Sequence, residues 1–122
     1  MKNAINWFEI PVDNFDRAKK FYSSVLSVTL HEMDFGVVKM AAFPTDGTGV
    51  GGALCHGEWY KPSQSGTLVY LNGGEDLSVP LSRVESAGGE IIIPKRQISE
   101  EYGYMAVIID SEGNRIAFHS LQ

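Results

Sequence analysis

The stretch Thr67–Ile93, TLVYLNGGEDLSVPLSRVESAGGEIII, reads as a strand, a turn, a helix and a second strand. Residues 5–30, INWFEIPVDNFDRAKKFYSSVLSVTL, have the same layout. Each half then continues with two apolar runs that a glycine-containing turn separates, at 37–43 and 50–55 and again at 104–109 and 115–119. Each half therefore reads as β-α-β-β-β. Two copies of one small unit must pack together to bury their sheets, and a pocket is expected where they meet.

Helix signals support this division of the chain. Apolar residues recur at helical spacing over Phe15–Leu26, and Asp13 or Asn14 can cap that helix. A second helix is expected over 77–87, with Asp76 or Ser78 as its cap and Gly88–Gly89 as its end. Residues 94–103 are expected to form a charged loop, either solvated or acting as a lid. The chain is thus predicted to be an α+β protein in a single domain, with module one over about 3–57, a linker over about 58–65 and module two over about 66–121.

Composition excludes several classes of function. The formal net charge is −5 over 122 residues, which argues against a nucleic-acid partner. No apolar run approaches the roughly 18 residues that cross a bilayer, so no membrane partner is expected. Cys55 is the one cysteine, which rules out an internal disulfide and favours a reduced, cytoplasmic location. A lone cysteine of this kind is more often a small buried hydrophobe than a nucleophile.

The order and spacing of short motifs resemble one known family, the vicinal oxygen chelate superfamily of glyoxalases, bleomycin resistance proteins and dioxygenases. The motifs that carry the resemblance are Val12-Asp13, Phe21-Tyr22, Tyr70-Leu71-Asn72, Ala87-Gly88-Gly89, Gly103-Tyr104-Met105-Ala106 and Asp110-Ser111-Glu112-Gly113-Asn114-Arg115-Ile116. The resemblance implies two βαβββ modules that form an open U-shaped mixed sheet with helices on its outer face. It also implies a homodimer, and in some members a divalent metal ion in the cleft.

The ligand positions that the resemblance implies hold Trp7, Thr67 and Ala117 here, none of which is a good metal ligand. Glu9 lies two residues from Trp7, and His119 lies two residues from Ala117, so period-2 alternation predicts that each shares the face of its neighbour. Glu9 and His119, with His56 as a third group, could therefore form a shifted metal site or a metal-free acid/base pair. The alternative is a hydrogen-bonded polar pair of Glu9 and His119 with no chemical role.

The expected cleft is lined by aromatic and small side chains. Its predicted substrate-binding residues are Trp7, Thr67, Val69, Tyr104 and Ala117, and its predicted catalytic residues are Glu9 and His119. Trp7 either lines the cleft or closes it, and Trp59 and Tyr60 of the linker could belong to a dimer interface.

The expected function is that of a glyoxalase- or bleomycin-resistance-like protein that binds a small molecule, without a firmly held cofactor. One alternative is a metal-dependent lyase or isomerase that uses Glu9 and His119. The other is a protein that sequesters a drug or metabolite. Whether the chain is an enzyme stays open from the sequence.

Overall fold

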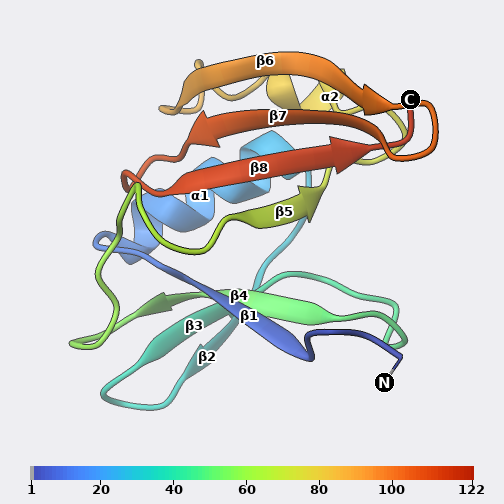
Figure 1. The fold of residues 1–122 in the computed structure, drawn as a ribbon. Coiled ribbons are helices and arrows are strands. Elements are labelled where there is room, and N and C mark those ends of the chain that lie inside the picture. Colours follow the sequence, from blue (N-terminus) through green and yellow to red (C-terminus); the bar gives the residue numbers. More distant parts are fainter. Residues whose placement is uncertain (1) are drawn as a thin grey trace.

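The fold consists of two four-stranded sheets with a helix between them, seen in a computed structural model that describes residues 2–122 (Figure 1). The first sheet contains β1 (Trp7–Pro11), β2 (His31–Asp34), β3 (Lys39–Ala42) and β4 (Gly51–His56), in the order β1-β4-β3-β2. The second contains β5 (Val69–Asn72), β6 (Glu90–Ser99), β7 (Gly103–Ile109) and β8 (Arg115–Ser120), in the order β5-β8-β7-β6. The shared strand order confirms the predicted α+β fold of two βαβββ modules.

Both sheets are mixed in the same way. β1 runs parallel to β4, and β5 runs parallel to β8, while all other neighbours are antiparallel. The registers correspond as well. The last pair of the parallel ladder is Pro11 and Cys55 in the first sheet, and Asn72 and His119 in the second. Cys55 and His119 are therefore equivalent positions in the two modules.

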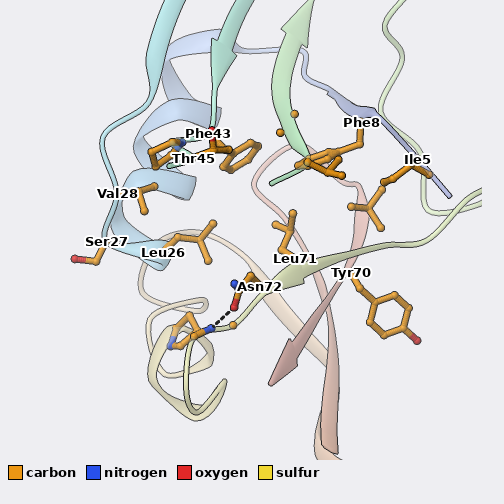
Figure 2. A pocket seen from close by; sticks show the side chains of 18 of the residues that line it. Ile5, Phe8, Leu26, Ser27, Val28, Phe43, Thr45, Tyr70, Leu71 and Asn72 are labelled. Carbon is orange, nitrogen blue, oxygen red and sulfur yellow. Dashed lines mark hydrogen bonds between the residues drawn. The ribbon is translucent and has the colours of Figure 1, made fainter. Parts of the chain in front are cut away.

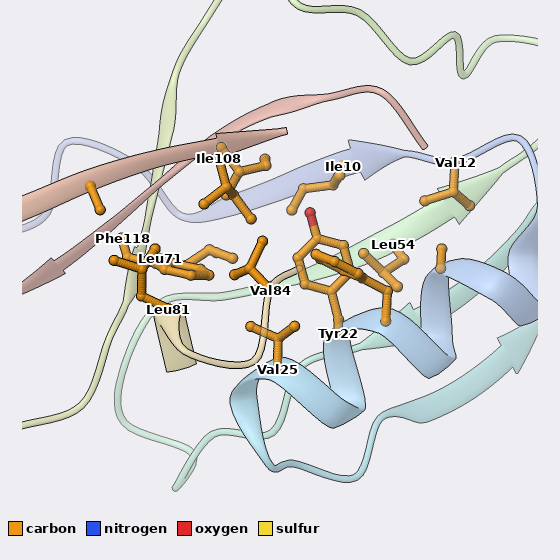
Figure 3. Close-up of a cluster of buried hydrophobic side chains, with 14 of the residues drawn as sticks. Ile10, Val12, Tyr22, Val25, Leu54, Leu71, Leu81, Val84, Ile108 and Phe118 are labelled. Atoms are coloured by element: carbon orange, nitrogen blue, oxygen red, sulfur yellow. The ribbon is translucent and has the colours of Figure 1, made fainter. Parts of the chain in front are cut away.

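The helix α1 (Phe15–Leu26) joins the two modules into one core. Its cap is Asn14, whose Oδ1 accepts a hydrogen bond from the backbone N–H of Arg17 at 3.0 Å. Its buried face is Ala18, Phe21, Tyr22 and Val25. These side chains pack against both sheets in one cluster, with Ile10 and Leu54 on one side and Ile108 and Phe118 on the other (Figure 3).

The second helix is shorter than the spacing predicts. α2 (Ser78–Leu81) has four residues, and turns follow it up to Gly88. In this region the backbone N–H of Arg83 donates to Pro80 and that of Val84 donates to Leu81, which is i→i−3 bonding. The hydroxyl of Ser82 also donates to the carbonyl of Val79, a local bond that competes with regular helix.

The charged segment 94–103 is mostly strand, so the prediction of a loop was wrong there. β6 continues to Ser99 in an antiparallel pairing with β7. Register shifts interrupt this pairing between Ile93 and Arg96, which is where Pro94 lies. An irregularity of this kind accommodates a residue that has no backbone N–H to donate.

Two smaller differences concern strand ends. The run Val28-Thr29-Leu30 precedes β2 instead of forming it, and β1 starts at Trp7 instead of Ile5. Within residues 2–122, neither helix has the length and apolar character that crossing a membrane requires.

Candidate functional site

A cavity of about 1360 Å³ opens between the two modules, beside the C-terminal end of α1. It is lined by β1, the residues after α1, the segment between β3 and β4, β5, and the region of α2. Figure 2 shows the side chains of Leu26, Phe43 and Leu71 around this space, whereas the ring of Tyr70 extends away from it. The cavity therefore has an apolar wall to which both modules contribute.

Glycine in β4 allows this wall to form. The rings of Phe8 and Phe43 lie 5.6 Å apart, centre to centre, on the helix-facing side of the first sheet. Phe8 pairs in register with Gly52, and a Cβ atom at Gly52 would lie only 2.3 Å from the Phe8 ring. The glycine-rich run before Cys55 thus lets an aromatic ring lie directly against the strand backbone.

Charged groups on the wall are mainly acidic. Glu9, Asp46, Glu75 and Asp76 line the cavity, together with Arg83. The carboxylate of Asp76 accepts a 2.8 Å ion-paired hydrogen bond from Lys95, which is the main reason that its pKa is lowered to about 2. The guanidinium of Arg83 donates to the carbonyl of Val25 at 3.0 Å, so it caps α1 rather than neutralising an acid.

Glu9 has a specific hydrogen-bonding arrangement at the edge of the cavity. Its Oε1 accepts from the Tyr60 hydroxyl at 2.8 Å, and its Oε2 accepts from the Trp7 indole Nε1 at 3.2 Å. The bond to Glu9 is the main cause that raises the pKa of Tyr60 to about 12, so this phenol keeps its proton at neutral pH. Tyr60 lies in the linker, and nothing in its local sequence points to Glu9, 51 residues away.

Cys55 lies next to this group on the same face of the sheet, and it is fully buried. Burial, helped by the nearby charge of Glu9, raises the pKa of the thiol to about 12. The nucleophilic form is the thiolate, so this cysteine is poorly suited to nucleophilic chemistry.

The structure separates the predicted site residues into two groups. Trp7, Glu9, Thr67 and Val69 line the cavity. Ala117, Tyr104 and His119 do not: Ala117 is fully buried in a second apolar cluster, with Met105 and Val107. The pairing of Val69 with Ile116, and of Tyr70 with Ala117, puts Val69 and Ala117 on opposite faces of the second sheet.

The remaining predicted polar residues have partners elsewhere. The Nε2 atom of His119 lies 2.6 Å from the carbonyl oxygen of Tyr102, and the Nδ1 atom of His56 lies 3.1 Å from that of Val12. The ring of Tyr104 receives the ammonium of Lys95 at 4.6 Å. The sequence analysis did not assign Leu26, Val28, Phe43 or Tyr60 to the site. The one signal that could have done so is period-2 alternation, which puts Phe43 on the same face of its strand as the buried Ala41.

A metal ion of the family kind does not fit the side chains of a single chain. Among residues 2–122, no three His, Cys, Asp or Glu side chains come together in a group that could hold one. Glu9 is bonded to Trp7 and Tyr60, and His119 and His56 face backbone carbonyls. We therefore assign no step of chemistry to a metal ion here.

Comparison with known proteins agrees with this geometry. The family model described as Glyoxalase/Bleomycin resistance protein/Dioxygenase superfamily matches residues 4–118, so the chain belongs to that superfamily. No protein with a curated description matches the sequence significantly.

Solved structures with the same fold include proteins of different roles. One is an antibiotic binding protein from Streptomyces sp. CB03234, with 20% identity, a TM-score of 0.65 and 98% coverage of both chains. Another is a genomically encoded fosfomycin resistance protein from Listeria monocytogenes, with 14% identity, a TM-score of 0.67, and coverage of 98% of this chain and 92% of that one. A glyoxalase I mutant from Zea mays has 15% identity and a TM-score of 0.74, and the match covers 97% of this chain but 45% of the maize chain. At these identities the similarity shows the fold and not the activity.

Proposed function

We propose that this protein binds an apolar or aromatic small molecule in the cavity between its modules. The observation that carries the proposal is the cavity itself, about 1360 Å³ in volume, with Phe8, Leu26, Phe43 and Leu71 on its wall. Small-molecule sites are commonly apolar clefts of about 300–1,000 Å³ with a few polar groups that orient the ligand. A cavity of this size suits a ligand at least as large as a typical drug molecule.

The chemistry of the wall supports binding more than catalysis. Among the described residues that line the cavity there is no His, Cys or Lys, and its acidic groups include Asp76, which is held in an ion pair. The similarity in fold to an antibiotic binding protein supports the same reading. In this proposal Trp7, Glu9, Thr67 and Val69 contact the ligand, and the protein sequesters it without changing it.

A direct test uses the neutral fluorescent naphthalene dye prodan, titrated into the purified protein. Val79 lines the cavity on α2 and is 52% exposed, so Val79→Trp adds an indole at the cavity without filling a packed core position. Val37 is 87% exposed and lies outside the cavity, which makes Val37→Trp the matched control. We expect Val79→Trp to weaken dye binding about tenfold or more, which is about 1.4 kcal/mol, and Val37→Trp to leave it unchanged.

Two results would contradict the proposal. Either no saturable dye binding is seen in the unaltered protein, or both tryptophan variants bind the dye as tightly as it does. The second result would move the binding site to another surface.

A catalytic role for Glu9 and His119 stays a prediction, as does the homodimer. Elemental analysis after dialysis against Zn, Mn, Ni or Fe(II), repeated on Glu9→Ala and His119→Ala, tests the metal-dependent form of that role. Sedimentation of the purified chain tests the latter, with the 89% exposed Trp59 as the first interface residue to substitute.

A further inference from the structure

Trp7 and Glu9 line the cavity from strand β1, on the face of the first sheet opposite to Phe8, and Glu9 is hydrogen-bonded there to Tyr60 of the linker. We propose that Glu9 in this setting binds the positively charged nitrogen of an organic amine, so that the ligand of the cavity is an aromatic or apolar cation. The inference rests on the proposed function, because it identifies the chemical class of molecule that the cavity takes.

The carboxylate of Glu9 is oriented but retains room to bind. Each of its oxygens accepts one hydrogen bond, from the Tyr60 hydroxyl at 2.8 Å and from Trp7 Nε1 at 3.2 Å. A carboxylate has about four acceptor sites, so one remains on each oxygen. Two aromatic donors fix its position while leaving its charge in place.

No Lys, Arg or His side chain among residues 2–122 forms an ion pair with Glu9. Asp76, in contrast, is held by Lys95 at 2.8 Å. Lys61 and Arg115 line a small adjoining pocket that also reaches Glu9, but the Arg115 guanidinium donates to the carbonyl of Gly66 at 2.9 Å. Glu9 therefore has aromatic hydrogen-bond donors but no cationic partner, and a cationic ligand would supply one.

The surroundings of Glu9 suit the other parts of such a ligand. The indole of Trp7 donates to Glu9 Oε2, so its ring lies beside the carboxylate and offers an aromatic surface to the apolar part of a ligand bound there. Trp7 is 45% exposed, so its ring is accessible to a ligand. Asp46 and Glu75 also line the cavity, and their charge favours a cation over an anion of the same shape.

Three probes of nearly equal shape test the proposal by calorimetry: 2-phenylethylammonium, 2-phenylethanol and 3-phenylpropanoate. The variants are Glu9→Gln, which keeps the shape of the side chain, and Glu75→Gln, which removes a charge elsewhere on the cavity wall. We expect the ammonium ion to bind the unaltered protein about tenfold more tightly than the alcohol, with the anion weakest. Glu9→Gln should reduce that preference to about twofold or less, while Glu75→Gln should preserve most of it.

Salt supplies a second measurement that needs no variant. The preference for the ammonium ion should fall as sodium chloride rises from about 0.05 M to about 0.5 M, because salt screens exposed charges.

The proposal is overturned if the alcohol binds as tightly as the ammonium ion, if the ammonium ion does not bind, or if Glu9→Gln and Glu75→Gln reduce the preference equally. The dye titration with Val79→Trp is independent of ligand charge. The cavity can therefore prove to be a binding site while its selectivity for cations fails, and the two failures are distinguishable.

Discussion

Glu112 joins the second module to the start of α1, and its replacement by glutamine is the most informative test of how the fold is held together. Its side chain is completely buried and accepts five hydrogen bonds. Two come from the backbone N–H groups of Asp13 and Asn14, at 3.0 and 2.6 Å. Two come from the Arg17 guanidinium and one from Ser111. The carboxylate therefore satisfies unpaired donors at the N-terminus of a helix that lies 95 or more residues earlier.

The expected cost follows from these contacts. A glutamine amide accepts on one atom only, so the donors that face the other atom meet an NH2 group. The remaining bonds become neutral, and charge-assisted bonds are roughly twice as strong as neutral ones. We expect Glu112→Gln to lower the free energy of unfolding by about 2–3 kcal/mol, a melting-temperature decrease of roughly 10 °C for a domain of this size.

Urea denaturation followed by far-ultraviolet circular dichroism measures this change. The matched control is Glu85→Gln, since Glu85 is exposed and the variant should stay within about 0.5 kcal/mol of the unaltered protein. If Glu112→Gln also stays within that range, the buried carboxylate does not hold the modules together as argued.

The pH dependence of stability provides a second readout for Glu112. Burial alone would raise the pKa of this carboxyl, but hydrogen bonds from Arg17, Asn14 and Ser111 and the charge of Arg17 outweigh burial, so that the pKa is lowered. A carboxyl with a lowered pKa in the folded state stabilises the fold above its ordinary value of 4.5, and this stabilisation is lost as the pH falls through the folded value. The difference between the unaltered protein and Glu112→Gln should therefore shrink as the pH falls below 4.5.

Three further predictions follow from single contacts. Gly52→Ala forces the Phe8 ring away from β4, so it should destabilise the protein by about 1–3 kcal/mol and weaken dye binding in the cavity, as urea denaturation and the prodan titration can show. The Cys55 thiol is buried and its pKa is raised to about 12, so in the native state it should react with Ellman's reagent only as fast as the protein opens. A reaction rate equal to that of a free thiol at neutral pH would contradict the burial of this side chain. Lys95 is the main cause that lowers the pKa of the Asp76 carboxyl from its ordinary value of 3.8 to about 2, so this carboxylate should stabilise the fold above pH 3.8 and lose that effect towards pH 2. The urea midpoints of Asp76→Asn and of the unaltered protein should therefore converge near pH 2. A difference that stays constant with pH would exclude the ion pair as the cause.

The features that the sequence predicted correctly are local ones. The helix Phe15–Leu26 follows from apolar spacing and from a cap at Asn14, three residues before its hydrogen-bond donor. The Asp-Gly turn at Gly47 and the turn at Gly113 both have positive φ, at 89° and 91°, as expected for glycine in such turns. The repeat of these signals in the second half was enough to predict two βαβββ modules.

The less accurate predictions concern places where local signals compete with packing. Residues 77–87 have helical spacing, but serine hydroxyls that bond to the backbone and i→i−3 turns shorten α2 to Ser78–Leu81. The charged residues of 94–103 suggested a loop, yet a register shift against β7 near Pro94 lets β6 continue to Ser99. In α2 competing local hydrogen bonds set the boundary, whereas in β6 the pairing with β7 sets it.

The composition of the site depended on tertiary structure. Alternation predicted that Trp7 and Glu9 share a face, and both line the cavity. It could not show that Val69 and Ala117 face opposite ways, because that depends on the registers of two strands far apart in the chain. The bonds from Tyr60 to Glu9 and from Asn14 to Glu112 span 51 and 98 residues, and no local pattern encodes them. The sequence by itself thus determined the repeated module and its helix, since backbone propensities and apolar spacing act over a few residues. Only the packing of one module on the other decided which side chains surround the cavity, since distant residues meet only when the core between them has formed.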